Sequence, residues 1–375
     1  MDTKEKKHSE IIQDEFDKAK KDADIVWRLV SSELEEPEAL LNYKGNPVIF
    51  KNSTVMIQGQ TGTHKSRLAT SLVSLLVSKD PGLNLLGFTK ATLDHPIIIY
   101  IDTERNIKYS LPIAIRQVLN ESGLDVETLR KQFNILPLVN VTRTYRTETM
   151  GKQFQEINNI NGQKNHFVVF LDIVSDFIPD FNNVIGSLQL TDLLNTASNS
   201  FDLTFVVVLH ENPGGEKARG HLGTELSNKA STILQISQSE VNEVFKLKIR
   251  KSRSTEKYSE VLLKFDPTVN NLRVVDDEKL GLEASDPDMI KLCTALGNKE
   301  FTSIERQALI EYLIYSLRWS QRKIEDKLKK LVSEGIKFES LFGIAILTKN
   351  RRKTTEYERV LIKEINSVPS ETFSL

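Results

Sequence analysis

The chain has 375 residues, 39% of them hydrophobic and 27% charged, which is enough to bury a sizeable core and excludes a wholly disordered or low-complexity protein. Fifty basic and 51 acidic residues give a net charge of -1, so a nucleic-acid partner would have to be met by a local basic patch. The single cysteine, Cys293, excludes an intrachain disulfide framework and a cysteine-based zinc site. No apolar run approaches the roughly 20 residues of a membrane span, and the start MDTKEKKHSE lacks a signal-peptide core. We therefore expect a cytoplasmic protein without membrane contact.

Residues 1–44 are densely charged, with sparse apolar residues at loosely helical intervals. They predict an N-terminal helical arm of one or two short amphipathic helices, which packs either on its own core or on a neighbouring subunit. From 45 to 275, apolar runs alternate with helical stretches: STVMIQ, HPIIIYID, FNILPLV, HFVVFLD and LTFVVVLH. This alternation predicts an α/β core in which helices cover both faces of a parallel sheet. Closely spaced runs after residue 230 predict antiparallel strands that complete the sheet.

A glycine-rich turn follows STVMIQ directly and precedes the helical run RLATSLVSLLVSK. The turn comprises Gly59, Gln60, Thr61, Gly62, Thr63, His64, Lys65 and Ser66. Apart from one position it has the phosphate-binding pattern GxxxxGK followed by Ser or Thr, in the strand–loop–helix context of that pattern. Backbone N–H groups of such a turn surround phosphates, while Lys65 would reach the β- and γ-phosphates and Ser66 would ligate Mg2+. The turn therefore predicts ATP and Mg2+ as cofactors.

His64 stands where the pattern has its last glycine. Either the backbone at this position accepts a side chain, or the turn has departed from its function. A glycine-rich turn before a buried helix is the alternative interpretation, but it does not account for Lys65 and Ser66 at the expected spacing. We expect His64 to cap the start of the helix, and to affect the rate of hydrolysis more than nucleotide binding.

Polar side chains end three of the predicted core strands. Asp102 and Glu104 follow IIIYI, Asp172 ends HFVVFLD, and His210 ends FVVVLH. In open α/β sheets, ligands bind at the edge where the carboxyl ends of the strands meet. Asp172 has the Walker B arrangement, in which a carboxylate holds Mg2+ through water.

The turn together with IDTE after the second core strand resembles the RecA/RadA recombinases and the DnaB/RepA-type ring helicases. Over about residues 45–275 the chain is most similar to the hexameric replicative helicases of plasmids and mobile elements. The resemblance implies a RecA-like ATPase core in which Glu104 polarises the water that attacks the γ-phosphate. It also implies that His210 is a sensor of nucleotide state. The alternatives are a solvated acid pair and a satisfied strand-end histidine, and KaiC-like timers share the same motifs.

Two further segments carry cations that the resemblance relates to DNA and to a ring. The glycine-rich segment ENPGGEKARGHLGTEL is similar to the second DNA-binding loop of RecA-like proteins, with Lys217, Arg219 and His221 as contacts. Arg219 also resembles the arginine finger of RepA-type helicases, the role that we favour. Lys251 and Arg253 continue one face of a predicted strand and resemble the DnaB-type pair that reaches the nucleotide of the adjacent subunit. A plain surface loop and a solvated basic hairpin are the alternatives.

Residues 276–288 are acidic, carry turn residues and are interpreted as a linker. Within 289–375, a capping box from Thr302 to Glu305 opens one predicted helix, Ser320 caps a second that Gly335 ends, and two strand-like pieces follow. This is the order of a winged helix-turn-helix. Between 318 and 353, eleven basic residues stand against four acidic ones, a local net charge of +7. We expect duplex or forked DNA here, and a protein-binding winged helix is the alternative.

The resemblance, together with the motifs, therefore implies an ATP-dependent DNA helicase or translocase that forms a homo-oligomeric ring, a hexamer, with single-stranded DNA in its channel. A nucleotide-switched DNA-binding regulator or loader without unwinding is the first alternative. The second is a non-catalytic assembly protein in which nucleotide only holds subunits together.

Overall fold

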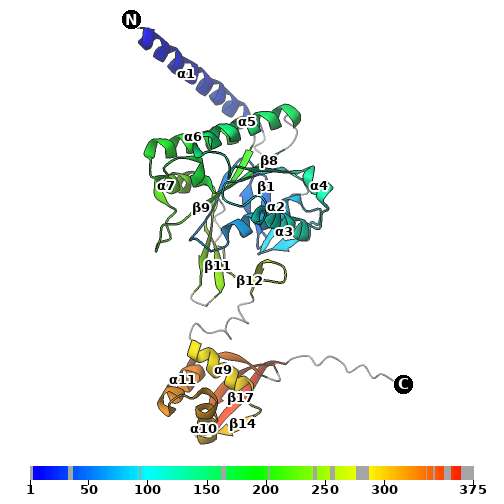
Figure 1. Cartoon of the computed structure of the whole chain (residues 1–375), viewed down its shortest axis with the longest axis vertical. Helices are drawn as coiled ribbons and strands as arrows, with labels where there is room; N and C mark the ends of the chain where they lie inside the picture. Colours follow the sequence, from blue (N-terminus) through cyan, green and yellow to red (C-terminus); the bar gives the residue numbers. More distant parts are fainter. Residues whose placement is uncertain are drawn as a thin grey trace, which may run out of the picture. The chain divides into compact units, whose positions relative to one another are not determined.

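The computed structural model describes residues 3–32, 37–92, 94–161, 166–201, 203–239, 243–253, 258–275, 287–334, 336–340, 343–349 and 356–364. The chain divides into two units, residues 1–39 and residues 40–375. The second unit contains the α/β core and a C-terminal module, which are described in turn (Figure 1).

In the described residues of the first unit there is one helix, α1 (Thr3–Val30), of 28 residues. One long helix thus replaces the one or two short helices expected from the sequence. Ile12, Phe16, Val26 and Trp27 on this helix are all exposed. The surface on which the arm packs stays a prediction.

The core is built on a nine-stranded sheet in the order β13-β12-β11-β10-β3-β9-β8-β6-β7, counted over the described residues. The parallel strands are β3 (Thr54–Gly59), β6 (Ile97–Asp102), β7 (Phe133–Pro137), β8 (Phe167–Asp172), β9 (Leu203–His210) and β10 (Thr232–Gln238). The antiparallel strands β11 (Val244–Lys251), β12 (Val261–Asp266) and β13 (Asn271–Val274) complete one side. The predicted mixed α/β fold with a large, mostly parallel sheet is confirmed.

Helices cover both faces of this sheet (Figure 1). One hydrophobic cluster contains side chains from α2 (Lys65–Val77), α3 (Ser110–Ser122) and α4 (Val126–Arg130). The other contains side chains from α5 (Arg143–Asn161), α6 (Val184–Phe201), α7 (Gly220–Lys229) and the 3-10 helix η2 (Val174–Phe177). Successive residues of β3 alternate between the clusters, with Val55 and Ile57 in the first and Met56 in the second, as the pleat of a strand requires.

A second, four-stranded sheet has the order β2-β1-β5-β4. Its strands are β1 (Ala39–Tyr43), β2 (Asn46–Phe50), β4 (Asn84–Leu85) and β5 (Phe88–Lys90). The rings of Tyr43 and Phe88 pack against each other at 4.8 Å, and both belong to the first hydrophobic cluster. The small sheet therefore shares the core of the large one.

The C-terminal module contains α9 (Pro287–Gly297), β14 (Ser303–Glu305), α10 (Arg306–Leu317), α11 (Gln321–Glu334), β15 (Lys337–Ser340), β16 (Gly343–Lys349) and β17 (Glu356–Glu364). Its strands form a sheet in the order β14-β17-β16-β15. A core of its own joins the three helices to this sheet. Compared with the predicted two helices and two strands, the module gains one helix and two strands.

Two details of the predicted module change. The predicted capping box is wrong, because Ser303–Glu305 is a strand paired with β17 and α10 begins only at Arg306, with no side-chain cap from Glu305. Ser320 does cap α11, since its hydroxyl accepts the backbone N–H of Lys323 at 3.4 Å. Residues 287–288 of the predicted linker belong to α9, whereas 276–286 and Gly335 lie outside the described residues. Among the helices that the structure describes, none is long and apolar enough to cross a bilayer.

Candidate functional site

The predicted polar strand ends meet at one edge of the large sheet. In the parallel pairing of β6 and β8, Asp102 lies opposite Asp172, and in that of β3 and β9, Gly59 lies opposite His210. The turn 59–66 connects β3 to α2 at this same edge. The carboxyl ends of parallel strands thus bring the turn, the carboxylates and the histidine together, as the sequence predicted.

The backbone of the turn has the form that an anion-binding site requires. A Cβ atom on Gly59 would lie 2.2 Å from the carbonyl oxygen of Ile236, so the close approach of β3 and β10 requires glycine. Gly62 and His64 have left-handed φ angles of +83° and +64°. Alternating backbone conformations of this kind turn successive N–H groups toward one side, and the first N–H groups of α2 have no partners within the helix. The turn can therefore surround phosphate oxygens.

His64 occupies the N-cap position of α2, but its side chain makes no capping hydrogen bond, so the predicted capping role is wrong. Its left-handed φ costs a residue other than glycine about 1–2 kcal/mol. The ring lies edge-on to Phe245 at 4.7 Å and stacked on Phe265 at 5.6 Å, which offsets that cost. Burial, aided by Arg67, lowers the pKa of His64 and favours a neutral ring. The imidazole thus joins the turn to strands β11 and β12.

Lys65 lies under the turn and is 4% exposed. Its Nζ donates a hydrogen bond to the carbonyl oxygen of Gln60 at 2.7 Å. Burial lowers the pKa of Lys65 to about 8, against the opposing effect of the acids Asp172, Glu104 and Glu211. A buried ammonium group whose charge is poorly compensated is suited to accept a polyphosphate.

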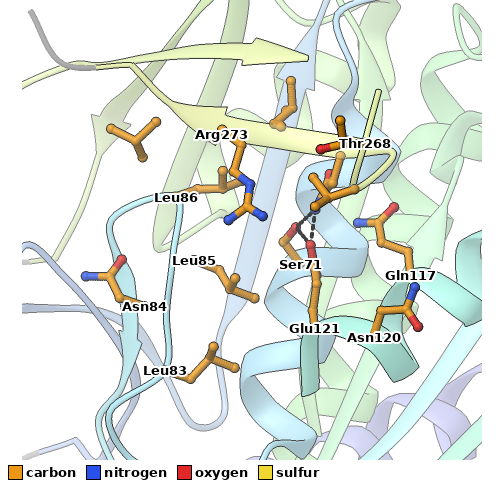
Figure 2. Close-up of a pocket in the computed structure, with 14 residues that line it drawn as sticks. Ser71, Leu83, Asn84, Leu85, Leu86, Gln117, Asn120, Glu121, Thr268 and Arg273 are labelled. Atoms are coloured by element: carbon orange, nitrogen blue, oxygen red, sulfur yellow. Dashed lines mark hydrogen bonds between the residues drawn. The ribbon is translucent and has the colours of Figure 1, made fainter. Parts of the chain in front are cut away.

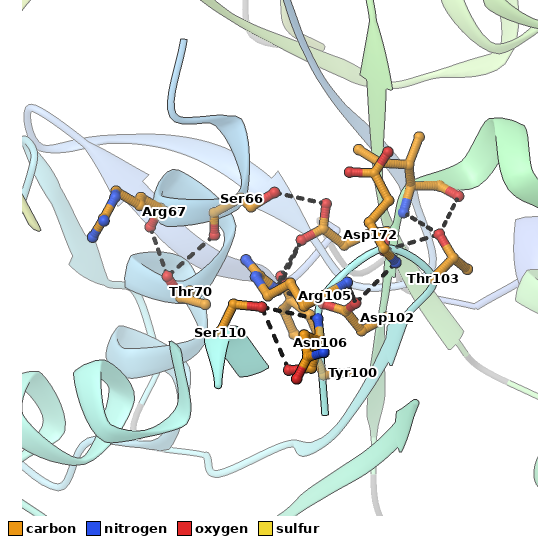
Figure 3. A network of polar contacts seen from close by, with 12 residues as sticks. Ser66, Arg67, Thr70, Tyr100, Asp102, Thr103, Arg105, Asn106, Ser110 and Asp172 are labelled. Atoms are coloured by element: carbon orange, nitrogen blue, oxygen red, sulfur yellow. Dashed lines mark hydrogen bonds and ion pairs between the residues drawn. The ribbon is translucent and has the colours of Figure 1, made fainter. Parts of the chain in front are cut away.

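Ser66 and Asp172 offer a magnesium ion the oxygen ligands that it prefers. The Ser66 hydroxyl donates to Asp172 Oδ1 at 2.9 Å, and the Tyr100 hydroxyl donates to Oδ2 at 2.7 Å (Figure 3). Burial raises the pKa of Asp172, which is 3% exposed. Over the described residues there is no cluster of three or more His, Cys, Asp or Glu side chains that could hold a metal alone. Mg2+ held by one carboxylate, a hydroxyl and the phosphates of a nucleotide fits this donor set.

Arg105 is part of the site and was missed by the sequence reasoning. Its Nη1 lies 2.5 Å from Asp102 Oδ2, 3.1 Å from Asp172 Oδ2 and 3.2 Å from the Tyr100 hydroxyl (Figure 3). Its backbone N–H donates to Asp102 Oδ1 at 2.7 Å. A cation three residues after a buried strand-end aspartate was the available signal. Arg105 therefore supplies a positive charge to two buried carboxylates.

Glu104 reaches solvent beside this cluster, with 54% of its side chain exposed. Its Oε1 lies 3.9 Å from His210 Nε2, and His210 lowers the pKa of Glu104 despite partial burial. His210 Nδ1 lies 3.5 Å from the Thr61 hydroxyl of the turn. The glutamate is thus ionised at neutral pH and accessible to water, and the histidine connects it to the turn. The roles of base and sensor stay predictions.

A buried network, also missed from the sequence, ties the turn to the segment after β9. Gln58 and Gln235 donate to Glu211 Oε1 at 2.7 and 2.6 Å. The Gln60 side chain donates to the carbonyl oxygens of Asn212 and Gly215 at 3.1 and 2.9 Å. A displacement of the turn would therefore be transmitted to residues 211–216.

The segment after His210 is shorter than predicted, because its second half is helix α7, which begins at Gly220. Leu222 and Leu226 of α7 are buried in the core. The three predicted DNA contacts, Lys217, Arg219 and His221, are exposed. The guanidinium of Arg219 lies over the Phe181 ring at 4.4 Å. The structure thus leaves its role, finger or DNA contact, a prediction.

Lys251 and Arg253 lie at the end of β11. Lys251 Nζ donates to the carbonyl oxygens of Ser227 and Asn228, each at 3.0 Å, at the carboxyl end of α7. Arg253 follows the strand and is exposed. Within the part of the chain that the structure describes, neither cation forms a hydrogen bond or ion pair with the turn 59–66. Their predicted action on a neighbouring subunit stays untested.

A separate cavity of about 620 Å3 lies between α2, α3, the segment 83–86 and the residues around β13 (Figure 2). None of its lining residues belongs to the turn 59–66. On its wall, Glu121 accepts hydrogen bonds from Ser74, at 2.8 Å, and from Asn271. Burial raises the pKa of Glu121. This cavity is therefore separate from the sheet edge at which the turn and the carboxylates meet.

No protein-family model and no curated protein matches the chain. Among solved structures, the chain is similar to the crystal structure of a KaiC-like protein from the hyperthermophilic archaeon Pyrococcus horikoshii OT3, with 14% identity and a TM-score of 0.40. The match covers 60% of this chain and 91% of that chain. A likeness of this size carries no functional argument, so function has to be argued from the site.

Proposed function

We propose that the chain is an ATP-dependent DNA helicase or translocase of the RepA type. It works as a homo-oligomeric ring, a hexamer, in the replication or mobilisation of a plasmid or mobile element. One observation carries the ATPase part of the proposal: the anion-binding turn, a buried lysine, a serine–aspartate pair and an accessible glutamate share one sheet edge.

Phosphate binding in this proposal starts from the turn. Its N–H groups and the buried ammonium of Lys65 hold the β- and γ-phosphates, and burial strengthens the contact that the lysine makes. Ser66 and Asp172 hold Mg2+, which when bound neutralises charge on the phosphate oxygens.

Glu104 is the proposed base for hydrolysis. A general base has to be ionised and within reach of the attacking water, and Glu104 is both ionised and open to solvent. His210 lies between Glu104 and Thr61 of the turn, a position suited to sensing the γ-phosphate. Gln60 then carries a change in the turn to residues 212 and 215.

The ring is proposed because two exposed cations could act on the nucleotide of a neighbouring subunit. Arg253 and Arg219 are exposed, and an arginine supplied to the nucleotide of the next subunit raises turnover by roughly 10^3–10^5 in other systems. Lys217, Arg219 and His221 would face single-stranded DNA in the channel, Arg219 in competition with its finger role.

The C-terminal module supports the DNA part of the proposal. In α11, Ile324 and Leu328 are buried, whereas Arg322, Lys329 and Lys330 are exposed. A helix with a cationic outer face beside a β-hairpin suits the major groove and the phosphate backbone of duplex DNA. We propose that this module is a winged helix.

The test is ATP turnover with and without single-stranded DNA. We expect stimulation by DNA, and at least about a 100-fold loss of turnover in Glu104→Gln with the nucleotide affinity preserved. ATP turnover that DNA does not stimulate would contradict the proposed helicase activity. Equal turnover in the variant and the wild type would contradict the role of Glu104 as general base. Sequence-selective binding of duplex without unwinding would favour the regulator or loader instead.

A further inference from the structure

The polar centre of the site contains two buried carboxylates that face one cation. Asp102 and Asp172 are 1% and 3% exposed and lie opposite each other on adjacent strands. Two buried anions at neighbouring positions repel each other unless a positive charge lies between them. Arg105, whose side chain is 17% exposed, supplies that charge.

The same nitrogen of Arg105 contacts both carboxylates. Nη1 lies 2.5 Å from Asp102 Oδ2 and 3.1 Å from Asp172 Oδ2. The contact with Asp102 is reinforced by the backbone N–H groups of Glu104 and Arg105, which donate to Asp102 Oδ1 at 3.1 and 2.7 Å. Asp102 thus fixes the position of the arginine, whereas the contact with Asp172 is longer and rests on this one atom pair.

Asp172 is the same carboxylate that would hold Mg2+. Its Oδ1 accepts from Ser66, and its Oδ2 accepts from Tyr100 and Arg105 (Figure 3). A divalent cation near Asp172 would repel a guanidinium on the same group, because a buried, low-dielectric site screens like charges weakly. The arginine and the metal therefore compete for one anion.

We propose that Arg105 is an internal counter-ion that stands in for Mg2+ on Asp172 and gives up this contact when Mg2+ and nucleotide bind. Asp102 keeps hold of the arginine during the exchange. Arg105 is then a positioning residue that sets the Mg2+ concentration at which the nucleotide is bound tightly. This inference rests on the proposed nucleotide site and adds its control by magnesium.

Two variants of the full chain and one control test the exchange. Arg105→Met removes the charge and keeps a similar length, and Arg105→Lys keeps a charge with a single donor group. The control is Arg143→Met, which removes an ion pair of 2.7 Å to Asp176 at a more exposed position. For each protein, the melting temperature and the binding of fluorescent ADP are measured in EDTA and across a Mg2+ titration.

In EDTA we expect Arg105→Met to melt on the order of 10 °C below the wild type, because two buried carboxylates lose their counter-ion. With ADP and saturating Mg2+ the part of that loss that belongs to Asp172 should be recovered, whereas the part that belongs to Asp102 should remain. The Mg2+ concentration at half-maximal ADP binding should fall by about tenfold or more, because the competing cation is gone. In the control variant, the difference in melting temperature from the wild type should not depend on Mg2+, and the Mg2+ midpoint of ADP binding should be that of the wild type.

A melting loss that is the same with and without Mg2+ and ADP, or an unchanged Mg2+ midpoint, would overturn the exchange and leave Arg105 a plain structural counter-ion. If Arg105→Met does not fold, Arg105→Lys is the deciding variant. Because lysine makes a weaker contact, its Mg2+ midpoint should be about threefold lower than that of the wild type. An unchanged midpoint would contradict the proposal. Wild-type chain that binds no ADP at any Mg2+ concentration would overturn the nucleotide site and this inference together. Binding with identical midpoints would overturn the inference alone.

Discussion

Replacing Lys65 by Met should stabilise the empty protein while abolishing nucleotide binding. The lysine is 4% exposed and its pKa is lowered from 10.5 to about 8, so the folded chain holds its charge at a cost. A buried charge that is kept for a ligand lowers the free energy of unfolding of the empty protein, and binding of the ligand removes this cost. Methionine fills a similar volume without the charge.

The size of the effect follows from the pKa. A change from 10.5 to about 8 corresponds to an upper limit of about 3 kcal/mol at about 1.4 kcal/mol per pH unit. Loss of the hydrogen bond from Nζ to the carbonyl oxygen of Gln60 takes back about 1 kcal/mol. The free energy of unfolding of the variant should therefore exceed that of the wild type by about 1–2 kcal/mol, which corresponds to about 2–8 °C in melting temperature.

The size of this stabilisation depends on pH. Because the folded pKa of Lys65 lies below the unfolded one, the cost is fully present below pH 8 and disappears as the pH rises toward 10.5. The difference between variant and wild type should thus be largest at pH 7. Thermal melts at pH 7 and pH 10 measure it, with the exposed Lys152→Met on α5 as control. A variant that melts below the wild type at pH 7 would refute the idea that the lysine is held at a cost.

Three further predictions concern the turn. The dissociation constant of ATP should be flat below pH 8 and rise toward tenfold per pH unit above it, because Lys65 must be protonated to bind phosphate; calorimetry that finds no change up to pH 9.5 would contradict this. His64→Gly should melt within about 3 °C of the wild type, because relief of the left-handed φ balances the lost contact with Phe245, and a large loss of ATP affinity would mean that the imidazole touches nucleotide. Gly59→Ala should lower the free energy of unfolding, measured with denaturant, by about 3 kcal/mol, because its Cβ would lie 2.2 Å from the carbonyl oxygen of Ile236. A variant as stable as the wild type would show that β3 and β10 can move apart.

The sequence was most informative where a pattern is local. Continuous apolar runs predicted the parallel strands, and the polar residues that end them predicted which side chains meet at the sheet edge. The turn 59–66 needed only its own spacing and its neighbours in the chain. These features depend on rules that hold whatever the rest of the chain does.

Features that depend on distant pairing were not predictable. The contact of Arg105 with Asp172 exists because β6 and β8 pair in a register that places Asp102 opposite Asp172. The ring of His64 packs on Phe265, which lies about two hundred residues later in the chain, whereas the sequence suggested a helix cap.

Two local expectations were wrong for different reasons. Ser303 and Glu305 pair with β17, so a strand displaced the expected capping box. Helix α7 was read as loop because of its glycines, although Leu222 and Leu226 at helical spacing were a visible signal that it packs on the core.

Calorimetry of the purified full chain with ATP and Mg2+, beside Lys65→Met, tests the proposed nucleotide site most directly. Saturable heat for the wild type, and none for a variant that is folded and at least as stable, is the predicted result. A wild-type chain that takes up no triphosphate, or a variant that binds it equally well, would contradict the assignment of the sheet edge as an ATP site.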